Sequence, residues 1–205
     1  NLFTPPSIEG TLAMPGIIGG GNWGGAAIDP STSYLFVKST EEPSLLRIAP
    51  ANPENTVADY AIDRTSSRTL RVRGLPISDP PYGTLTAIDM NAGEHLWMTP
   101  LGNGDRLRNH PLLRDLDLPP LGGDDSRSGP LLTKTLLVHA LTTGGTDGGP
   151  QLVAYDKATG AVVAAIDLPS GAIGTPMTYM VDGRQYIALA IGGRPPELIA
   201  FALPD

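Results

Sequence analysis

Apolar and polar positions follow the same order three times along the chain. Each copy places an apolar run before an aspartate, at Asp29, Asp89 and Asp156, and starts a second apolar run shortly after it. The copies begin 60 and 67 residues apart. Alternation such as that of residues 84–88 predicts a half-buried strand on each side of a tight turn. A strand–turn–strand unit that recurs at this spacing favours propeller blades or a β-solenoid.

The aspartates and glycines of the repeat indicate turn chemistry rather than catalysis. The carboxylate of Asp89 can accept hydrogen bonds from backbone N–H groups about two residues further on. Gly93 and Gly160 supply the positive φ that such turns often need, and the first copy has Ser33 at that place. Trp97 follows the second turn and is placed to cover the junction between two neighbouring blades.

Between the repeats the pattern is less regular. Residues 1–20 are rich in Pro and Gly and predict a loop that enters a blade. Residues 41–80 contain several prolines and a polar run and predict an irregular excursion, with one short extended element at 69–72. Residues 103–130 predict a long connection of the kind that often carries function. Asp182-Gly183 lies between two apolar runs and predicts a hairpin. No segment has a helical period over 11 residues, so the predicted class is all-β, with three or four blades.

Composition narrows the function classes. Hydrophobic residues make up 40% of the 205, which argues against disorder despite 25 glycines and 21 prolines. Cysteine is absent, which excludes disulfides and thiolate metal sites. The net charge is −7, and the sequence has no cluster of basic residues beyond Arg68, Arg71 and Arg73. We therefore expect no nucleic-acid partner.

Targeting signals are also absent from the sequence. No stretch approaches the roughly 18 apolar residues of a membrane span, and no signal peptide is visible. The first residue is Asn1 rather than Met, so we expect a piece of a longer protein.

Few residues qualify as catalytic or metal-binding groups. His110 lies in the long connection and is a weak candidate for function, whereas His95 and His139 lie in predicted strands and are expected to be structural. Asp124-Asp125 lacks the regularly spaced oxygen ligands of a calcium loop and predicts a solvated turn. The signatures of a phosphate loop, a nucleophile elbow and a zinc protease are absent.

Four motifs in the chain resemble the C-terminal part of quinoprotein dehydrogenases, and they stand in that family's order. They are residues 20–27, 83–89, 175–179 and 191–193. The resemblance implies an eight-bladed propeller that uses pyrroloquinoline quinone (PQQ) and calcium, and the glucose and quinate dehydrogenase branch is the most similar. It also implies that residues 1–205 are the C-terminal portion of a single propeller domain, with no separate second domain.

The resemblance assigns cofactor-binding roles to four positions. Asn22 is similar to a family residue that hydrogen-bonds the cofactor, and its side-chain amide offers two donors without charge. Trp23 is expected to form a wall of the site. Gly192-Gly193 resembles the family loop that covers the quinone, where missing side chains let the backbone approach closely. The alternatives are a turn residue at Asn22 and an ordinary turn at Gly192-Gly193.

Arg194 departs from the family, which commonly has an aromatic residue or His at this place beside the substrate. Its planar guanidinium suits an anionic or polyhydroxylated substrate. The alternative is a surface cation paired with Glu197.

The family's general base, calcium ligands, stacking Trp and basic quinone contact lie on earlier blades. We therefore expect no catalytic residue and no metal ligand in this chain, with calcium held outside it. Three or four blades cannot close a ring, so this chain alone should be inactive, and its exposed edges should meet the missing N-terminal blades or a second copy.

The sequence thus favours part of a PQQ-dependent dehydrogenase that oxidises a sugar, a polyol or a cyclic alcohol by hydride transfer to the quinone. Electrons would pass to a quinone or another acceptor in the periplasm, with membrane association through a segment not present here. The alternative is a non-enzymatic propeller that serves as an assembly scaffold of the cell envelope. Such a scaffold would keep the aspartate turns and would not need Asn22 or Gly192-Gly193.

Overall fold

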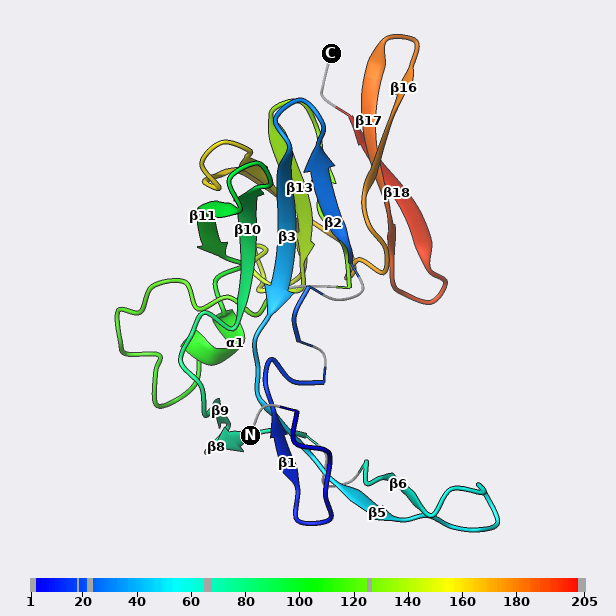
Figure 1. Cartoon of the computed structure of the whole chain (residues 1–205). Helices are drawn as coiled ribbons and strands as arrows, with labels where there is room; N and C mark the ends of the chain where they lie inside the picture. Colours follow the sequence, from blue (N-terminus) through cyan, green and yellow to red (C-terminus); the bar gives the residue numbers. More distant parts are fainter. Residues whose placement is uncertain (1–2, 18, 22–23, 65–67, 125–126, 203–205) are drawn as a thin grey trace. The chain divides into compact units, whose positions relative to one another are not determined.

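The structure is a computed structural model, and it describes residues 3–17, 19–21, 24–64, 68–124 and 127–202. These residues form strands, together with one short helix, α1 (Asp105–Arg108), in the long connection (Figure 1). The chain divides into two compact units. The larger unit comprises residues 21–40 and 80–205, and the smaller unit comprises residues 1–20 and 41–79. The all-β prediction is therefore confirmed.

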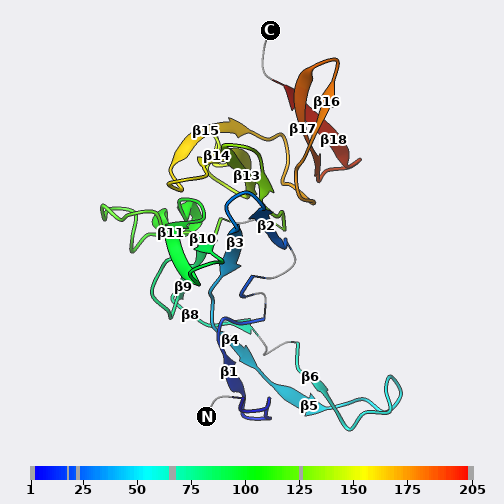
Figure 2. The ribbon, with the colours of Figure 1, turned by 45° about the horizontal axis from the view of Figure 1, so that its top comes forward.

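The larger unit contains two four-stranded antiparallel sheets and one three-stranded antiparallel sheet. The first sheet has the order β11-β10-β3-β2, the second β12-β13-β14-β15, and the third β16-β17-β18. Figure 2 shows the three sheets from a second direction. The strands are β2 (Ala26–Asp29), β3 (Tyr34–Thr40), β10 (Gly83–Asp89), β11 (Glu94–Pro100), β12 (Leu131–Leu132), β13 (Leu136–Leu141), β14 (Gln151–Asp156), β15 (Val162–Asp167), β16 (Met177–Val181), β17 (Arg184–Ile191) and β18 (Glu197–Ala202).

Two buried clusters join the three sheets face to face. Phe36 and Leu85 of the first sheet pack with Leu137 and Tyr155 of the second. Val138 of the second sheet packs on its other side with Leu189 and residues near it. Strands β12, β13 and β14 of the middle sheet thus alternate their side chains between two neighbouring sheets. Antiparallel sheets that stack in chain order, each with its first strand at one edge, are the arrangement of propeller blades.

The predicted turns are confirmed. Asp29 accepts a hydrogen bond from the Ser31 N–H at 3.0 Å, Asp89 from the Asn91 N–H at 2.8 Å, and Asp156 from the Ala158 N–H at 2.9 Å. The position that ends each turn has a positive φ, at Ser33 (61°), Gly93 (73°) and Gly160 (73°). Val181 pairs with Arg184 around Asp182 and Gly183, which both have positive φ as a type I′ hairpin requires.

At these turns, side-chain contacts connect the first and second sheets. The Trp97 indole N–H donates to the Lys157 carbonyl at 3.2 Å, and a Cβ on Gly160 would lie only 2.6 Å from the Trp97 ring. The Lys157 ammonium lies 2.6 Å from the Asp29 carboxylate. This ammonium, with the N–H and hydroxyl of Ser31, holds the pKa of Asp29 well below its usual value. We call this the turn end of the larger unit, defined by Asp29, Trp97, Lys157 and Gly160.

The smaller unit has more strands than the sequence predicts. Its sheets are β1-β4-β7, β5-β6 and β8-β9. The predicted extended element near residues 69–72 is confirmed. The prediction of loops throughout residues 1–20 and 41–68 is wrong, because short strands form there. Backbone pairing across prolines is possible there because each strand is only two or three residues long. The strands are β1 (Thr11–Ala13), β4 (Ser44–Leu46), β5 (Ile48–Pro50), β6 (Tyr60–Ile62), β7 (Arg68–Thr69), β8 (Arg71–Val72) and β9 (Leu75–Pro76).

Candidate functional site

Three chain segments converge at the opposite end of the strands from the turn end. Gly24 precedes β2, Gly129 precedes β12, and Thr175 precedes β16, and each of these strands is an edge strand of its sheet. The Gly129 N–H donates to the Thr175 hydroxyl at 2.9 Å, and β12 lies beside β2. We call this the inner-strand end, defined by Gly24, Ser128, Gly129 and Thr175. In a propeller these edge strands line the central channel, so this end is where a ligand would enter it.

The glycines at this end are required by the close approach of two backbones. A Cβ on Gly24 would lie 2.5 Å from the Ser128 carbonyl oxygen and 2.7 Å from Cε of Lys38. A Cβ on Gly129 would lie 1.9 Å from the Gly24 carbonyl oxygen. Gly25 has open space but a φ of 68°, which favours glycine for a different reason. Both glycines that follow Asn22-Trp23 therefore have a physical cause.

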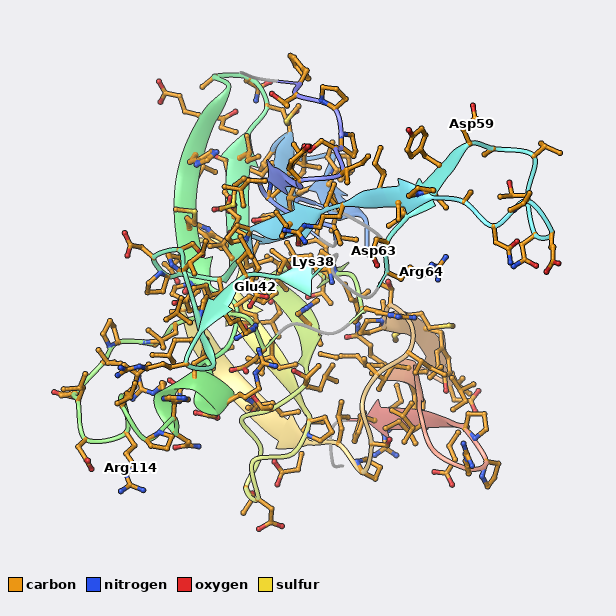
Figure 3. The ribbon with its side chains drawn as sticks, turned by 90° about the horizontal axis from the view of Figure 1, so that it is seen from below. Lys38, Glu42, Asp59, Asp63, Arg64 and Arg114 are labelled. Atoms are coloured by element: carbon orange, nitrogen blue, oxygen red, sulfur yellow. The ribbon has the colours of Figure 1, made fainter. Side chains whose placement is uncertain are left out.

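Two nitrogen-bearing side chains are buried at this end. Lys38 on β3 is 5% exposed and His139 on β13 is 0% exposed. Lys38 shares a strand face with Phe36, and His139 shares one with Leu137 and Leu141. Because those apolar residues belong to one cluster between the first and second sheets, Lys38 and His139 lie in the same interface. Figure 3, seen from below, labels Lys38 in this region.

The imidazole of His139 is held neutral. Burial, and then the positive charge of Lys38, lower the pKa of His139 to about 3, and the Gly129 backbone opposes this shift. Both ring nitrogens are buried, and the Gly129 backbone is a hydrogen-bonding neighbour of the imidazole. His139 therefore lies in a strand, as predicted, and its imidazole is buried beside the Gly129 backbone.

The loop of residues 192–196 lies at the same end of the third sheet. Met177, just after Thr175, pairs with Ala188 near the end of β17, which places the following loop beside the start of β16. The Gly192 N–H donates to the Gly171 carbonyl at 2.8 Å, and Gly193 has a φ of 134°. A Cβ on Gly192 would make only ordinary contacts, at 3.5 Å or more. Glycine is thus favoured by conformation at Gly193.

Of the remaining predicted site residues, the structure describes Arg194 but not Asn22 or Trp23. Asn22 and Trp23 lie outside the described residues, so the expected meeting of Asn22 with Gly193 stays a prediction. Arg194 is exposed, and the ion pairs of the described residues include none between Arg194 and Glu197. The pairing of Arg194 with Glu197 is therefore not observed among the described residues.

The prediction of a solvated turn is wrong for Asp124, which is 3% exposed. Its carboxylate accepts a hydrogen bond from the Gly104 N–H, and its carbonyl accepts one from the Thr142 N–H at 2.6 Å. The positive φ of Gly102 and Gly104 lets the long connection fold around this side chain. Burial, and then the charge of Asp124, raise the pKa of Tyr155. Asp124 thus fixes the long connection to the second sheet, and Asp125 lies outside the described residues.

His110 has a local structural contact. Its Nδ1 accepts a hydrogen bond from the Leu112 N–H at 3.2 Å. In the described part of the chain, no group of three or more His, Asp or Glu side chains is arranged to hold a metal ion. The described helix is also too short to cross a membrane.

These sheets and their inner-strand end define a set of β-propeller blades. The sequence matches the family described as "PQQ: Glucose/ethanol/alcohol dehydrogenase, beta-propeller domain" over residues 1–187. The chain belongs to this family. The resemblance drawn from the four motifs, and the propeller fold that it implied, are therefore confirmed.

Several curated proteins are similar to nearly the whole chain. Quinoprotein glucose dehydrogenase of Escherichia coli (strain K12) is 28% identical over 100% of this chain and 28% of its own length. Quinate/shikimate dehydrogenase (quinone) of Acinetobacter baylyi is 29% identical over 94% of this chain and 26% of its own length. The glycerol dehydrogenase large subunit of Gluconobacter oxydans is 31% identical over 99% of this chain, and the match covers 31% of its own length. The chain thus spans under a third of the length of these relatives.

Solved structures agree on the fold. The quinohemoprotein alcohol dehydrogenase from Comamonas testosteroni matches with a TM-score of 0.58 and 23% identity, over 89% of this chain and 24% of that one. A europium-containing methanol dehydrogenase matches with a TM-score of 0.53 and 22% identity, over 82% and 24%.

Sequence reasoning missed Lys38 as a site residue and treated His139 only as structural. One signal was available. Strand alternation through Phe36 places Lys38 at a core position, and alternation through Leu137 and Leu141 does the same for His139. A lysine in a core register is unusual, and it is the signal in the sequence that distinguishes this end of the strands.

Proposed function

We propose that this chain is part of a PQQ-dependent dehydrogenase that oxidises a glucose-type sugar, a polyol or a cyclic alcohol. The match of residues 1–187 to the PQQ dehydrogenase propeller family carries this proposal. The relatives named above as glucose, quinate/shikimate and glycerol dehydrogenases support the range of substrates. When bound, the quinone supplies the acceptor for the hydride that leaves the alcohol carbon.

The inner-strand end has the chemistry that a planar tricarboxylate needs. Gly24 and Gly129 bring backbone close to the channel without side chains. Lys38 and His139 contribute a cation and a neutral imidazole. These features fit the cofactor, because PQQ carries carboxylates and ring carbonyls that accept hydrogen bonds.

Within this end we assign the predicted residues to binding rather than chemistry. The amide of Asn22 would donate to the cofactor, and Trp23 would form a wall. Gly192-Gly193 would cover the quinone. Arg194 would use its fork of N–H donors to hold substrate hydroxyl or carboxylate groups at the rim.

The parts of the reaction that this chain does not supply are proposed to lie on the remaining blades. These are a carboxylate that takes the hydroxyl proton, and the oxygen ligands of a calcium ion. The third sheet is suited to receive such a blade, since Met177 and Leu198 lie on the face turned away from the second sheet and are more than half exposed. A quinone or another acceptor in the periplasm would take the electrons, and a segment outside this chain would associate the protein with the membrane.

The family match favours this enzyme over the envelope scaffold considered from the sequence. Dye reduction by the intact protein separates the two functions. We expect turnover of glucose, quinate or glycerol only when PQQ and calcium are both added. Absence of turnover with any of these alcohols, and absence of retained PQQ, would instead indicate the scaffold.

A further inference from the structure

Thr175 joins two blades at the inner-strand end through its side chain. Its hydroxyl accepts a hydrogen bond from the Gly129 N–H at 2.9 Å. Gly129 is buried and precedes β12 of the second sheet, whereas Thr175 precedes β16 of the third sheet. A buried N–H that loses its acceptor has a cost in free energy, because it was desolvated when the chain folded. This hydrogen bond therefore constrains where the third sheet meets the second.

Gly129 extends the link to the first blade. A Cβ on Gly129 would lie 1.9 Å from the Gly24 carbonyl oxygen and 2.8 Å from the Thr175 hydroxyl oxygen. The backbones of Gly24 and Gly129 are thus in direct contact, and the Thr175 side chain borders the same point. Segments that lead into three different sheets meet here, although they are far apart in the sequence.

The segment that precedes Thr175 also holds the loop that follows β17. The Gly192 N–H donates to the Gly171 carbonyl at 2.8 Å, and the Ile173 N–H donates to the Ala190 carbonyl at 3.0 Å. These backbone hydrogen bonds fix the segment against the end of β17, where the loop begins. A shift of Thr175 relative to the second sheet would therefore be passed on to the loop.

A second threonine in the same strand region differs in one respect. The Thr178 hydroxyl donates to the Tyr186 carbonyl at 2.9 Å and accepts a hydrogen bond from the Gln185 side chain at 2.9 Å. Both contacts of Thr178 stay within the third sheet, because Gln185 and Tyr186 belong to β17. The hydroxyl of Thr175 instead connects two sheets, so a substitution can remove that connection without removing a strand contact.

We propose that Thr175 is a positioning residue of the cofactor site. By accepting the hydrogen bond from Gly129, its hydroxyl holds the loop that contains Gly192 and Gly193 in place relative to Gly24 and Gly129. This rests on the proposed function, which places PQQ at the inner-strand end with that loop over the quinone. Thr175 acts through these backbones, and it takes no part in proton or hydride transfer.

The test compares Thr175→Val with Thr178→Val in the intact protein. Valine keeps the shape of threonine and removes the hydroxyl, whereas Thr175→Ser retains the hydroxyl. Fluorescence titration of the apo protein measures the affinity for PQQ, and hydrogen exchange measures the protection of the Gly129 amide. A cooperative thermal transition checks that each variant is folded.

Thr175→Val should weaken PQQ binding by about fivefold to tenfold, because a hydrogen bond that orders the site is lost. The Gly129 amide should exchange faster in this variant, and so should the amides of Gly24 and Gly192. Thr175→Ser should bind PQQ as the wild type does. Thr178→Val should do the same, even where its melting temperature falls as much as that of Thr175→Val.

Unchanged PQQ affinity in Thr175→Val, with faster exchange at Gly129, would overturn the positioning role and leave the proposed function intact. Unchanged exchange at Gly129 would overturn it as well. If the wild type binds no PQQ, the proposed function fails and hydrogen exchange alone decides. Faster exchange at Gly24 and Gly192 as well as Gly129 then supports the link across the three sheets, and faster exchange at Gly129 alone rejects it.

Discussion

The two ends of the blades in the larger unit satisfy their polar groups in different ways. At the turn end, Asp29 accepts hydrogen bonds from Ser31 and pairs with Lys157, and the Trp97 indole donates to a carbonyl. At the inner-strand end, the His139 imidazole is fully buried and kept neutral, with the Gly129 backbone and Lys38 as its polar neighbours. Both ends are formed by the same strands. The difference between their polar groups therefore does not come from which strands form each end.

We interpret this difference as a division between the groups that maintain the fold and those that serve the proposed ligand. The repeated sequence pattern codes for the turn end, where polar side chains close turns and join blades. The inner-strand end has no repeated pattern, because each blade contributes a different residue to one site. Four substitutions test this division, beginning with the largest expected effect.

Gly24→Ala should disrupt the inner-strand end. The new Cβ would meet the Ser128 carbonyl oxygen at 2.5 Å, and backbone atoms cannot move aside as a flexible side chain can. We expect a loss of about 3 kcal/mol or more in unfolding free energy, and weaker PQQ binding. Gly25→Ala is the matched control, since its Cβ has open space and only the φ of 68° opposes it, at about 1–2 kcal/mol. Equal losses in urea unfolding of the two variants would contradict the close approach.

Trp97→Ala should weaken the turn end without changing cofactor affinity. It removes the ring that covers Gly160 and packs against Phe36 at a centroid distance of 6.0 Å. The expected cost is about 3 kcal/mol, measured as a shift of the urea midpoint, with the PQQ dissociation constant within twofold of the wild type. A large change in PQQ affinity would show that the two ends are coupled rather than separate.

His139 should make stability fall in mild acid. Its folded pKa is about 3, whereas the ordinary value is 6.5. Below pH 6.5 the imidazole binds a proton in the unfolded chain but stays neutral in the folded protein. The free energy of unfolding therefore decreases as the pH falls from 6.5, by up to about 1.4 kcal/mol per pH unit. Asp29 acts at lower pH, because a carboxyl with a lowered pKa loses its contribution only below its ordinary value of 3.8. Urea midpoints between pH 5 and 6.5 should therefore have a smaller slope in His139→Leu than in the wild type, and identical slopes would argue that the imidazole is not kept neutral.

Lys157→Met should have the smallest effect. It removes the partner of Asp29 at the turn end but leaves the hydrogen bonds from Ser31 in place. We expect a lower melting temperature at pH 7, by less than in Trp97→Ala, and no further decrease when Asp29→Asn is already present. Additive effects of the two substitutions would mean that the ion pair does not join the blades.

The sequence allowed prediction of the turn end because its interactions are local. Asp89 bonds two residues ahead and Gly93 needs only its own φ, so both can be inferred from a short window. The Asp182-Gly183 hairpin was predictable for the same reason. The short strands between residues 41 and 79 were not, because they depend on pairing between distant segments that have no strong pattern of their own.

The inner-strand end was only partly predictable. The glycines after Trp23 were identified through family resemblance, but their cause lies in contacts with Ser128 and Gly129, far along the chain. The burial of Asp124 likewise depends on a turn at Gly102–Gly104 that a local pattern does not define. Lys38 and His139 come together only when two blades stack.

Hydrogen exchange of the intact protein with and without PQQ tests the division between the two ends most directly. Bound cofactor should slow exchange of backbone amides at residues 24–26, 128–131 and 192–193. Amides of the aspartate turns, at residues 31–33, 91–93 and 158–160, should exchange at the same rate in both states. Protection confined to the aspartate turns, or no protection at either end despite saturation with PQQ, would contradict the placement of the cofactor at the inner-strand end.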